Sequence, residues 1–202
     1  LLLPLVEEEN ICLPLPVNVV SRYWNVELPM TEAIESAKQY SDFNGSIIIE
    51  GIDLAERHGL SCKIIHSSLV ELKKIIDSGI PPIVLLPGIP EITQHASVIT
   101  GYSEEEKTIL HYVQKGNREG EQQEGAIPQD IFDREWSEEG RLLIIIAPSD
   151  TLSNITLENN SQDKSNRLCF NSEKQNILKN SIEALQLLKE SIELDSSNST
   201  AL

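Results

Sequence analysis

One cysteine stands immediately before a predicted helix in the stretch "ENICLPLPVNVVSRYW", residues 9–24. Proline is tolerated only before a helix or within its first turn, so Pro14 and Pro16 indicate that the helix begins at Pro16 at the latest. The dipole and the free N–H groups of a helix N-terminus favour a thiolate. Cys12 is therefore a candidate nucleophile. The alternative is that Cys12 is a small buried side chain, and its position alone does not decide between the two.

A thiolate nucleophile needs an imidazole that carries the proton and a further side chain that orients the imidazole. Among the four histidines, His58 falls in the last turn of a predicted helix and His66 in a polar turn, which is typical of structural histidines. His111 falls within a predicted strand. His95 begins "HASVITGY", where a strand follows a loop, so its imidazole can face a cleft at the rim of a sheet. His95 is the candidate base, with a structural histidine as the alternative.

Helical patterns that could position the cysteine dominate the first eighty residues. Ser68 and Glu71 have the spacing of a capping box, and Gly59 and Gly79 can end helices with a left-handed backbone. Apolar residues at helical spacing then predict helices over four ranges: 16–24, 31–40, 49–58 and 68–78.

Strand patterns that could position the histidine dominate the second part of the chain. The polar stretch "SEEEK" has the length of a hairpin turn, and 116–127 is rich in Gly, Glu and Gln and is predicted to be a mobile loop. Strands are predicted over five ranges: 62–65, 80–86, 95–102, 108–114 and 142–147. Helices followed by an antiparallel sheet predict an α+β domain over 1–148.

The remaining residues form a predicted appendage. The range 149–171 is polar and reads as a linker, and 172–202 as a helical segment whose helix ends near Leu194. The apolar stripe of this helix needs a cover, either from its own domain or from another chain. The stripe contains Ile182, Leu185, Leu188 and Ile192.

Composition excludes several classes of protein. With a formal net charge of −16 and no cluster of Lys and Arg, the chain is not expected to bind nucleic acid. Apolar runs such as Leu142–Ala147 are far shorter than the ~20 residues of a membrane span. The three cysteines have no zinc-ligand spacing, so we expect no metal, no cofactor and reduced thiols in a cytoplasmic protein. Since residue 1 is Leu1 and not Met, we expect that the sequence begins inside a longer protein.

Several short stretches follow one another in an order that is known from a peptidase family. Cys12 and Pro14 precede a hydrophobic helix ending in Tyr23 and Trp24, and then come "LAERHGL", "SLVELKKIIDSGIPPIVLL", "HASVITGY", and "IFDREW" followed by "LLIIIAP". Over 1–148 the chain thus resembles the papain-like bacteriocin-processing (double-glycine) cysteine peptidases. The resemblance implies a papain-like fold, with N-terminal helices packed on an antiparallel sheet, and a catalytic pair of Cys12 and His95.

The chain departs from the family pattern at the groups that support this pair. The family's glycine after the cysteine is replaced by Leu13, and its oxyanion-binding glutamine maps onto Val6, which cannot donate a hydrogen bond. The family's Asp-Pro pair, whose acid orients the imidazole, maps onto Tyr112 and Val113. The resemblance therefore implies a peptidase that lacks two supporting groups.

Neighbouring side chains could replace the missing acid. Gln114 and Asn117 could accept a hydrogen bond from the imidazole, and Tyr112 itself stands at the position of the acid. We expect either a weakly active or degenerate cysteine peptidase that acts on peptide bonds, or a non-catalytic module that binds a peptide or protein. Acyl transfer or amide hydrolysis on a non-peptide substrate would use the same pair.

The tail "SIEALQLLKESIELDSSNSTAL", residues 181–202, resembles part of a tetratricopeptide repeat, with Ser196 at the place of the usual proline. Such a repeat is one helical pair that needs neighbours, and at least ~3 repeats form a stable array. The resemblance implies further repeats or a protein partner at the C-terminal helix. The alternative is a generic amphipathic helix.

Overall fold

A six-stranded sheet forms the centre of the molecule. The computed structural model describes residues 1, 14–29, 31–32, 35, 48–87, 94–113, 123–155 and 160–201. The strands are β1 (Ser61–His66), β2 (Ile83–Pro87), β3 (Gln94–Ser103), β4 (Thr108–Val113), β5 (Gln123–Pro128) and β6 (Leu142–Ala147). Their order in the sheet is β1-β6-β2-β3-β4-β5, and neighbouring strands are antiparallel.

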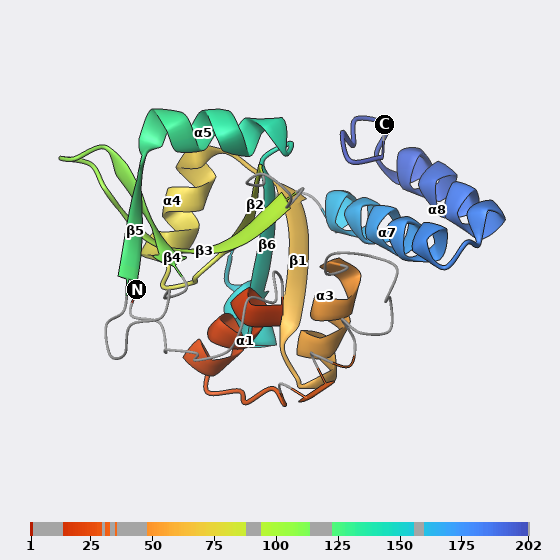
Figure 1. Cartoon of the computed structure of the whole chain (residues 1–202), viewed down its shortest axis with the longest axis horizontal. Coiled ribbons are helices and arrows are strands. Elements are labelled where there is room, and N and C mark those ends of the chain that lie inside the picture. Colours follow the sequence, from red (N-terminus) through yellow and green to blue (C-terminus); the bar gives the residue numbers. More distant parts are fainter. Residues whose placement is uncertain are drawn as a thin grey trace.

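Helices cover both faces of the sheet, which confirms the predicted α+β class. Figure 1 shows α1 and α3 on one side of the sheet, α4 and α5 on the other, and the α7–α8 pair beside β1. The helices are α1 (Pro14–Tyr23), α3 (Ile48–Arg57), α4 (Leu69–Asp77), α5 (Gln129–Glu138), α6 (Ser149–Ser153), α7 (Asn160–Ile177) and α8 (Ser181–Leu194). No helix in the described part of the chain combines the length and the apolar composition that crossing a membrane requires.

Two apolar clusters fill the space between the helices and the sheet. The first cluster joins α1 and α3 to one face of the sheet, and the second cluster joins α4 and α5 to the other face. Strand β6 contributes to both, because alternate side chains point to opposite faces. Its uniformly apolar sequence, in which all six residues are buried, follows from this double burial.

Local signals in the sequence define α4 and the ends of two helices. The Ser68 hydroxyl accepts a hydrogen bond from the Glu71 backbone N–H at 3.2 Å, which confirms Ser68 as the N-cap of the predicted capping box, and the hydroxyl also donates to the Glu71 carboxylate. Gly59 and Gly79, which follow α3 and α4, have φ angles of 86° and 78°. A side chain would be strained there, so the two glycines end these helices as predicted.

Two predicted boundaries are wrong within the sheet. Strand β5 occupies part of the range 116–127 that was predicted as a loop, because Gln123–Pro128 pairs with β4 although its sequence has little strand propensity. Strand β2 begins only at Ile83, after the two prolines of "GIPPIV". The helix predicted over 31–40 lies mostly outside the described residues.

The C-terminal part differs most from the prediction. The range 149–171, predicted as a linker, contains α6 and the first part of α7. The single helix predicted over 172–194 is broken between α7 and α8, where Lys179 has a φ of 64°. The part of α7 before Ser172 was missed because the buried face of this helix is largely polar. The polar residues buried there are Asp163, Ser165, Asn166 and Ser172.

The predicted apolar stripe is only partly covered by protein. Leu188 and Ile192 are half-buried, whereas Ile182 is 89% exposed and Leu185 is 54% exposed. The side of α8 that packs on α7 carries small residues, including Ala184 and Ser191. The division into a domain over 1–148, a linker and an appendage remains a prediction.

Candidate functional site

Two aromatic side chains determine how α1 lies on the sheet. The Tyr23 hydroxyl donates to the Gly79 carbonyl at 2.8 Å, and the Trp24 indole N–H donates to the Ile146 carbonyl at 2.9 Å. The two rings contact each other edge to face, with 4.9 Å between their centroids. Because both bonds attach the C-terminal end of the helix to the body of the domain, they orient the opposite end, which follows Cys12.

The candidate nucleophile precedes this helix by two residues. Cys12 lies outside the described residues, as do Val6 and Leu13, whereas α1 is described from Pro14 onwards. The observed start agrees with the prediction that the helix begins at Pro16 at the latest. The helix that was predicted to follow Cys12 is therefore present in the structure.

The candidate base lies on a strand that contacts α1. The backbone of His95 is the second residue of β3 and pairs with Leu86 of β2. Helix α1 contacts β3 and β6, and its Val17 and Val20 share the first cluster with Val98. Helix α1, which follows Cys12 in the sequence, and strand β3, which contains His95, are thus in contact.

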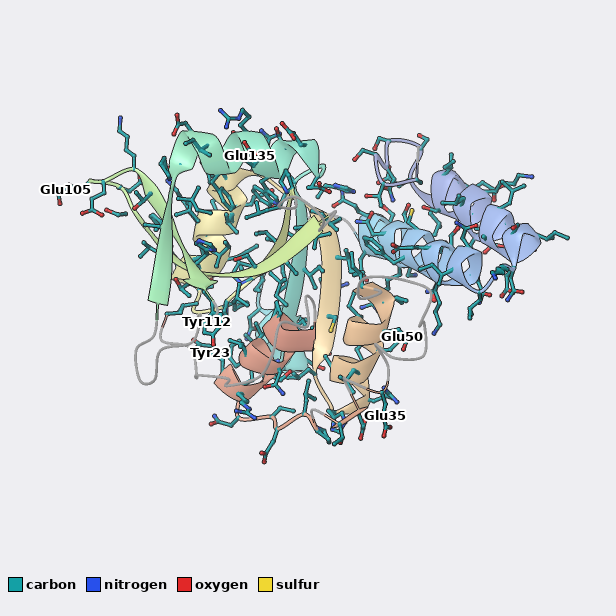
Figure 2. All side chains as sticks on the ribbon, in the orientation of Figure 1. Tyr23, Glu35, Glu50, Glu105, Tyr112 and Glu135 are labelled. Atoms are coloured by element: carbon teal, nitrogen blue, oxygen red, sulfur yellow. The ribbon has the colours of Figure 1, made fainter. Side chains whose placement is uncertain are left out.

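The candidates for the orienting group lie on or after β4. Tyr112 is on β4, is half-buried and packs against the first cluster, the cluster to which α1 also contributes. Figure 2 labels Tyr112 and Tyr23, both of which pack against this cluster. Gln114 and Asn117 lie outside the described residues.

The structure also shows a serine–histidine contact that the sequence analysis missed. The hydroxyl of Ser97 on β3 lies 2.8 Å from Nδ1 of His111 on β4. Ser97 is buried at 1% exposure, so this hydroxyl is not available to a substrate. Ser97 and His111 are brought together by the register of the β3–β4 hairpin, which shifts at a bulge between Ile99 and Gly101. Because such a bulge cannot be predicted from the sequence, the contact was missed.

The two described cysteines lack the surroundings that a nucleophile needs. Cys62 on β1 and Cys169 on α7 are both buried, and burial raises the pKa of each thiol above its ordinary value. A raised pKa leaves less thiolate at neutral pH. Cys12 is therefore the one cysteine that remains as a candidate.

Two other histidines make contacts within the protein. His58 lies 3.3 Å from a Glu32 carboxylate oxygen. His66 is the last residue of β1, not part of a turn as predicted, and its Nδ1 lies 2.6 Å from the Gly140 carbonyl oxygen. In the described part of the chain, no group of three or more His, Cys, Asp or Glu side chains could hold a metal ion.

Comparisons with known proteins identify the fold. No protein-family model matches the sequence, and no curated protein gives a significant match. The chain is similar to a double glycine motif protease from an AMS/PCAT transporter, crystallised in complex with the leader peptide. The TM-score is 0.54 at 20% sequence identity, and the match covers 73% of this chain and 92% of that one.

Two further peptidase structures are similar. The peptidase domain of Streptococcus ComA, a bi-functional ABC transporter involved in a quorum sensing pathway, matches with a TM-score of 0.55 and 18% identity, over 71% of this chain and 97% of that one. A C39-like peptidase from Bacillus anthracis matches with a TM-score of 0.52 and 15% identity, over 71% and 91%. At such identities the likeness concerns the fold: this chain has the α+β fold of double-glycine-motif and C39-like peptidase domains.

Proposed function

We propose that this chain is a peptide-binding domain with a cysteine peptidase site of low turnover, formed by Cys12 and His95. The proposal rests on the packing of α1, which follows Cys12, against β3, which contains His95. This packing occurs in a fold that three peptidase domains share. One of these relatives binds a leader peptide, which supports a peptide as the ligand here.

The proposed reaction is peptide hydrolysis through a thioester. The Cys12 thiolate attacks the carbonyl carbon of a peptide bond, and the C–N bond breaks as His95 donates a proton to the leaving amine. Water then hydrolyses the thioester, and His95 takes the proton of that water. A helix N-terminus beside Cys12 supports the thiolate in both steps.

Low turnover follows from the replaced supporting groups. Loss of one oxyanion donor costs ~10² to 10³ in rate, and loss of the group that orients the imidazole costs ~10⁴. These losses share part of their effect, so the factors do not simply multiply. Val6 cannot donate to an oxyanion, and Tyr112 stands where the family has an acid. Binding a peptide does not require either group.

Alkylation and cleavage together test the proposed pair. Cys12 is titrated with iodoacetamide between pH 5 and 9 in wild type and in a His95→Ala variant, and a mixed peptide library is assayed with wild type and Cys12→Ala. We expect alkylation of Cys12 at a pH below that of a free thiol, a shift toward the free thiol in His95→Ala, and slow cleavage that Cys12→Ala abolishes. A Cys169→Ala variant is the matched control and should behave like wild type.

The outcomes separate catalysis from binding. Cleavage at the rate of an ordinary peptidase would contradict the low turnover and show that another side chain fills a supporting role. A Cys12 profile equal to that of a free thiol, without cleavage, would remove the catalytic pair. In that case retention of library peptides by Cys12→Ala would leave a non-catalytic peptide-binding module as the function.

The non-catalytic alternative includes attachment to tetratricopeptide-like repeats, and this part remains a prediction. Its support is that α7 and α8 form a helical pair, in which the Ser172 hydroxyl donates to the Ala184 carbonyl at 2.8 Å. Small residues such as Ser172 and Ala184 at the contact allow the two helices to pack closely.

A further inference from the structure

The outward side of α8 carries apolar side chains that the rest of the chain does not cover. Ile182 is 89% exposed and Leu185 is 54% exposed. Ala184 and Ser191, whose backbones bond to α7, lie roughly 180° around the helix from Ile182. Figure 1 shows α8 on the side of α7 that is away from the sheet. In this arrangement neither α7 nor the sheet covers Ile182.

Polar bonds fix α8 in this orientation on α7. The Ser165 hydroxyl donates to the Ser191 carbonyl at 2.8 Å, and the Ser172 hydroxyl donates to the Ala184 carbonyl at 2.8 Å. The Asn198 amide, which follows α8, donates to the Ser165 hydroxyl at 2.8 Å. All five residues are buried, so turning α8 to cover its apolar side would leave buried polar groups without partners.

Helix α7 is in turn bonded to the sheet and to α3. Asp163 accepts a hydrogen bond from the Ile64 N–H at 2.8 Å, and Asn166 donates to the Ile64 carbonyl at 2.9 Å. The Arg167 guanidinium lies 2.7 Å from a carboxylate oxygen of Glu56 on α3. The outward side of α8 is thus presented on a helix pair that is fixed to the domain.

The exposed apolar residues belong to a stripe along α8. Ile182, Leu185 and Ile192 lie three and seven residues apart, which places them on one side of the helix. The stripe is roughly 15 Å long, from the rise of the helix per residue. A single exposed apolar residue such as Val70 on α4 is ordinary, whereas an apolar stripe on a helix is typical of a surface that packs on protein.

A second helix is the occupant that fits this stripe. The backbone groups within α8 bond to one another, so they offer no partners to an added strand. The stripe is straight and narrow, and the side-chain ridges of one helix pack into the grooves of another. An amphipathic helix binds an apolar surface in this way, through residues three and four positions apart.

Unpaired carboxylates lie beside the stripe. Glu183, Glu190 and Glu193 are exposed, and Lys189 is the one basic residue of α8. The three carboxylates lie within roughly 100° of Ile182, on the side away from Leu185. None of them takes part in the ion pairs of the described residues. Basic side chains on an incoming helix would be attracted to this row.

We propose that the outward side of α8 is a docking surface for an amphipathic helix of a partner protein, with lysines or arginines beside its apolar face. Charge disfavours the other occupants. A second copy of this chain brings another net charge of −16 and the same row of carboxylates, and an anionic membrane surface is repelled by that row. This surface is independent of the proposed peptidase-like site, because the argument uses neither Cys12 nor His95.

Synthetic peptides and the full chain test the chemistry of the partner. The probe is a dye-labelled helix of about 18 residues, with leucines on one face and lysines beside them, long enough to span the stripe. Two control peptides have glutamates in place of the lysines, or the same composition in scrambled order. By fluorescence anisotropy we expect the basic amphipathic helix to bind at least about tenfold more tightly than either control, and more weakly as salt is added.

A double variant tests the stripe. Ile182→Gln combined with Leu185→Gln removes the two exposed apolar side chains and keeps good helix formers, so we expect peptide binding to weaken at least about tenfold. The matched control is Val70→Gln combined with Ile131→Gln, which removes two exposed apolar side chains from α4 and α5. This control should bind the peptide as wild type does.

A second double variant tests the carboxylates. Glu190→Gln combined with Glu193→Gln should weaken binding of the basic helix about threefold at low salt and reduce its dependence on salt. The matched control is Glu105→Gln combined with Glu106→Gln, two exposed glutamates in the turn between β3 and β4. Equal effects of the two variants would show that the net charge, and not the row on α8, attracts the peptide, and would overturn the proposal.

Other results would also overturn the proposal. These are no binding of the basic helix to wild type, equal binding of a control peptide, and equal losses in the two glutamine variants of apolar residues. A wild-type dimer in sedimentation that Ile182→Gln/Leu185→Gln abolishes would make a second copy the occupant. Wild-type binding to phosphatidylserine vesicles that the same variant abolishes would make it a membrane. If this variant fails to fold by circular dichroism, Leu185→Gln alone should still weaken peptide binding, and unchanged binding would count against the proposal equally.

Discussion

At the scale of single residues, two tyrosine hydroxyls differ in the burial and the partners of their hydrogen bonds. The half-buried Tyr23 bonds to the Gly79 carbonyl and fixes α1, whereas the Tyr102 hydroxyl bonds to Asp77 at the exposed surface. We predict that Tyr23→Phe lowers the free energy of unfolding by about 1 kcal/mol, and that Tyr102→Phe lowers it by less than about 0.5 kcal/mol. Urea titrations of the two variants check this. Equal losses would mean that the Tyr23 bond does not anchor the helix.

The thiols of Cys62 and Cys169 should not react with thiol reagents in the native protein. Burial raises the pKa values of Cys62 and Cys169, so at pH 8 a smaller fraction of each is thiolate than of a free cysteine. We predict that native Cys12→Ala does not react with a disulfide reagent at pH 8, and that two thiols react after unfolding in guanidinium. Rapid reaction of the native variant would show that a described cysteine is accessible.

At the scale of elements, α4 depends on one hydroxyl at its start. Ser68 accepts from the Glu71 N–H, and an alanine there leaves this donor without its cap. We predict that Ser68→Ala lowers the free energy of unfolding by about 1 kcal/mol, and that Ser68→Asp, which can still accept the bond, changes it little. Denaturant titration measures both. A loss of the same size for Ser68→Asp would indicate that the cap bond is not the cause.

The elements that sequence could predict are those with local causes. Helix α4 has a cap, an apolar face and a closing glycine, so its bounds follow from neighbouring residues. Strand β6 is recognisable because it is apolar throughout. Strand β5 was missed, since Gln123–Pro128 becomes a strand by pairing with β4, which is a tertiary effect. The part of α7 before Ser172 was missed for the same reason, since its buried Asp163 and Asn166 bond to β1 and its buried Ser165 bonds to Ser191 of α8.

The candidate site was predictable in part. The spacing of Cys12 before a proline-marked helix and of His95 at the start of a strand predicted the two elements, and both exist. The contact between Ser97 and His111 was not predictable, because it depends on the bulged register of two strands. A feature that depends on residues adjacent in the sequence can be predicted from the sequence alone. A contact between residues on different strands can be found only once the fold is known.

At the scale of the whole molecule, the question is whether the α7–α8 pair is an appendage or part of the domain. The match to the peptidase domains leaves more than a quarter of this chain outside it. Yet α7 bonds to the edge of the sheet, contributes Phe170 to the first cluster and forms ion pairs with α3. These contacts link the helical pair both to the sheet and to α3.

We therefore predict that the sheet and the α7–α8 pair unfold in one cooperative transition. The chain offers a clean test, because its two tryptophans, Trp24 and Trp136, both lie in the sheet-containing part and none lies in α7 or α8. Tryptophan fluorescence thus reports the sheet, and circular dichroism at 222 nm includes the two helices. Coincident urea transitions by both probes are expected if the domain is one unit.

A matched variant sharpens this test. The double variant Asp163→Leu/Asn166→Leu removes the two side-chain bonds to Ile64 of β1, so its loss of helical signal should precede the change in fluorescence. The control Lys164→Leu/Asn176→Leu, which changes two exposed residues of α7, should keep one transition. An early helical transition in wild type would contradict the prediction and make the pair an independent appendage. Separate transitions arise when an element opens at a lower free energy than the rest. Since opening α7 in wild type also removes Phe170 from the first cluster and breaks the ion pairs with α3, we expect its opening to require the free energy of unfolding the whole domain.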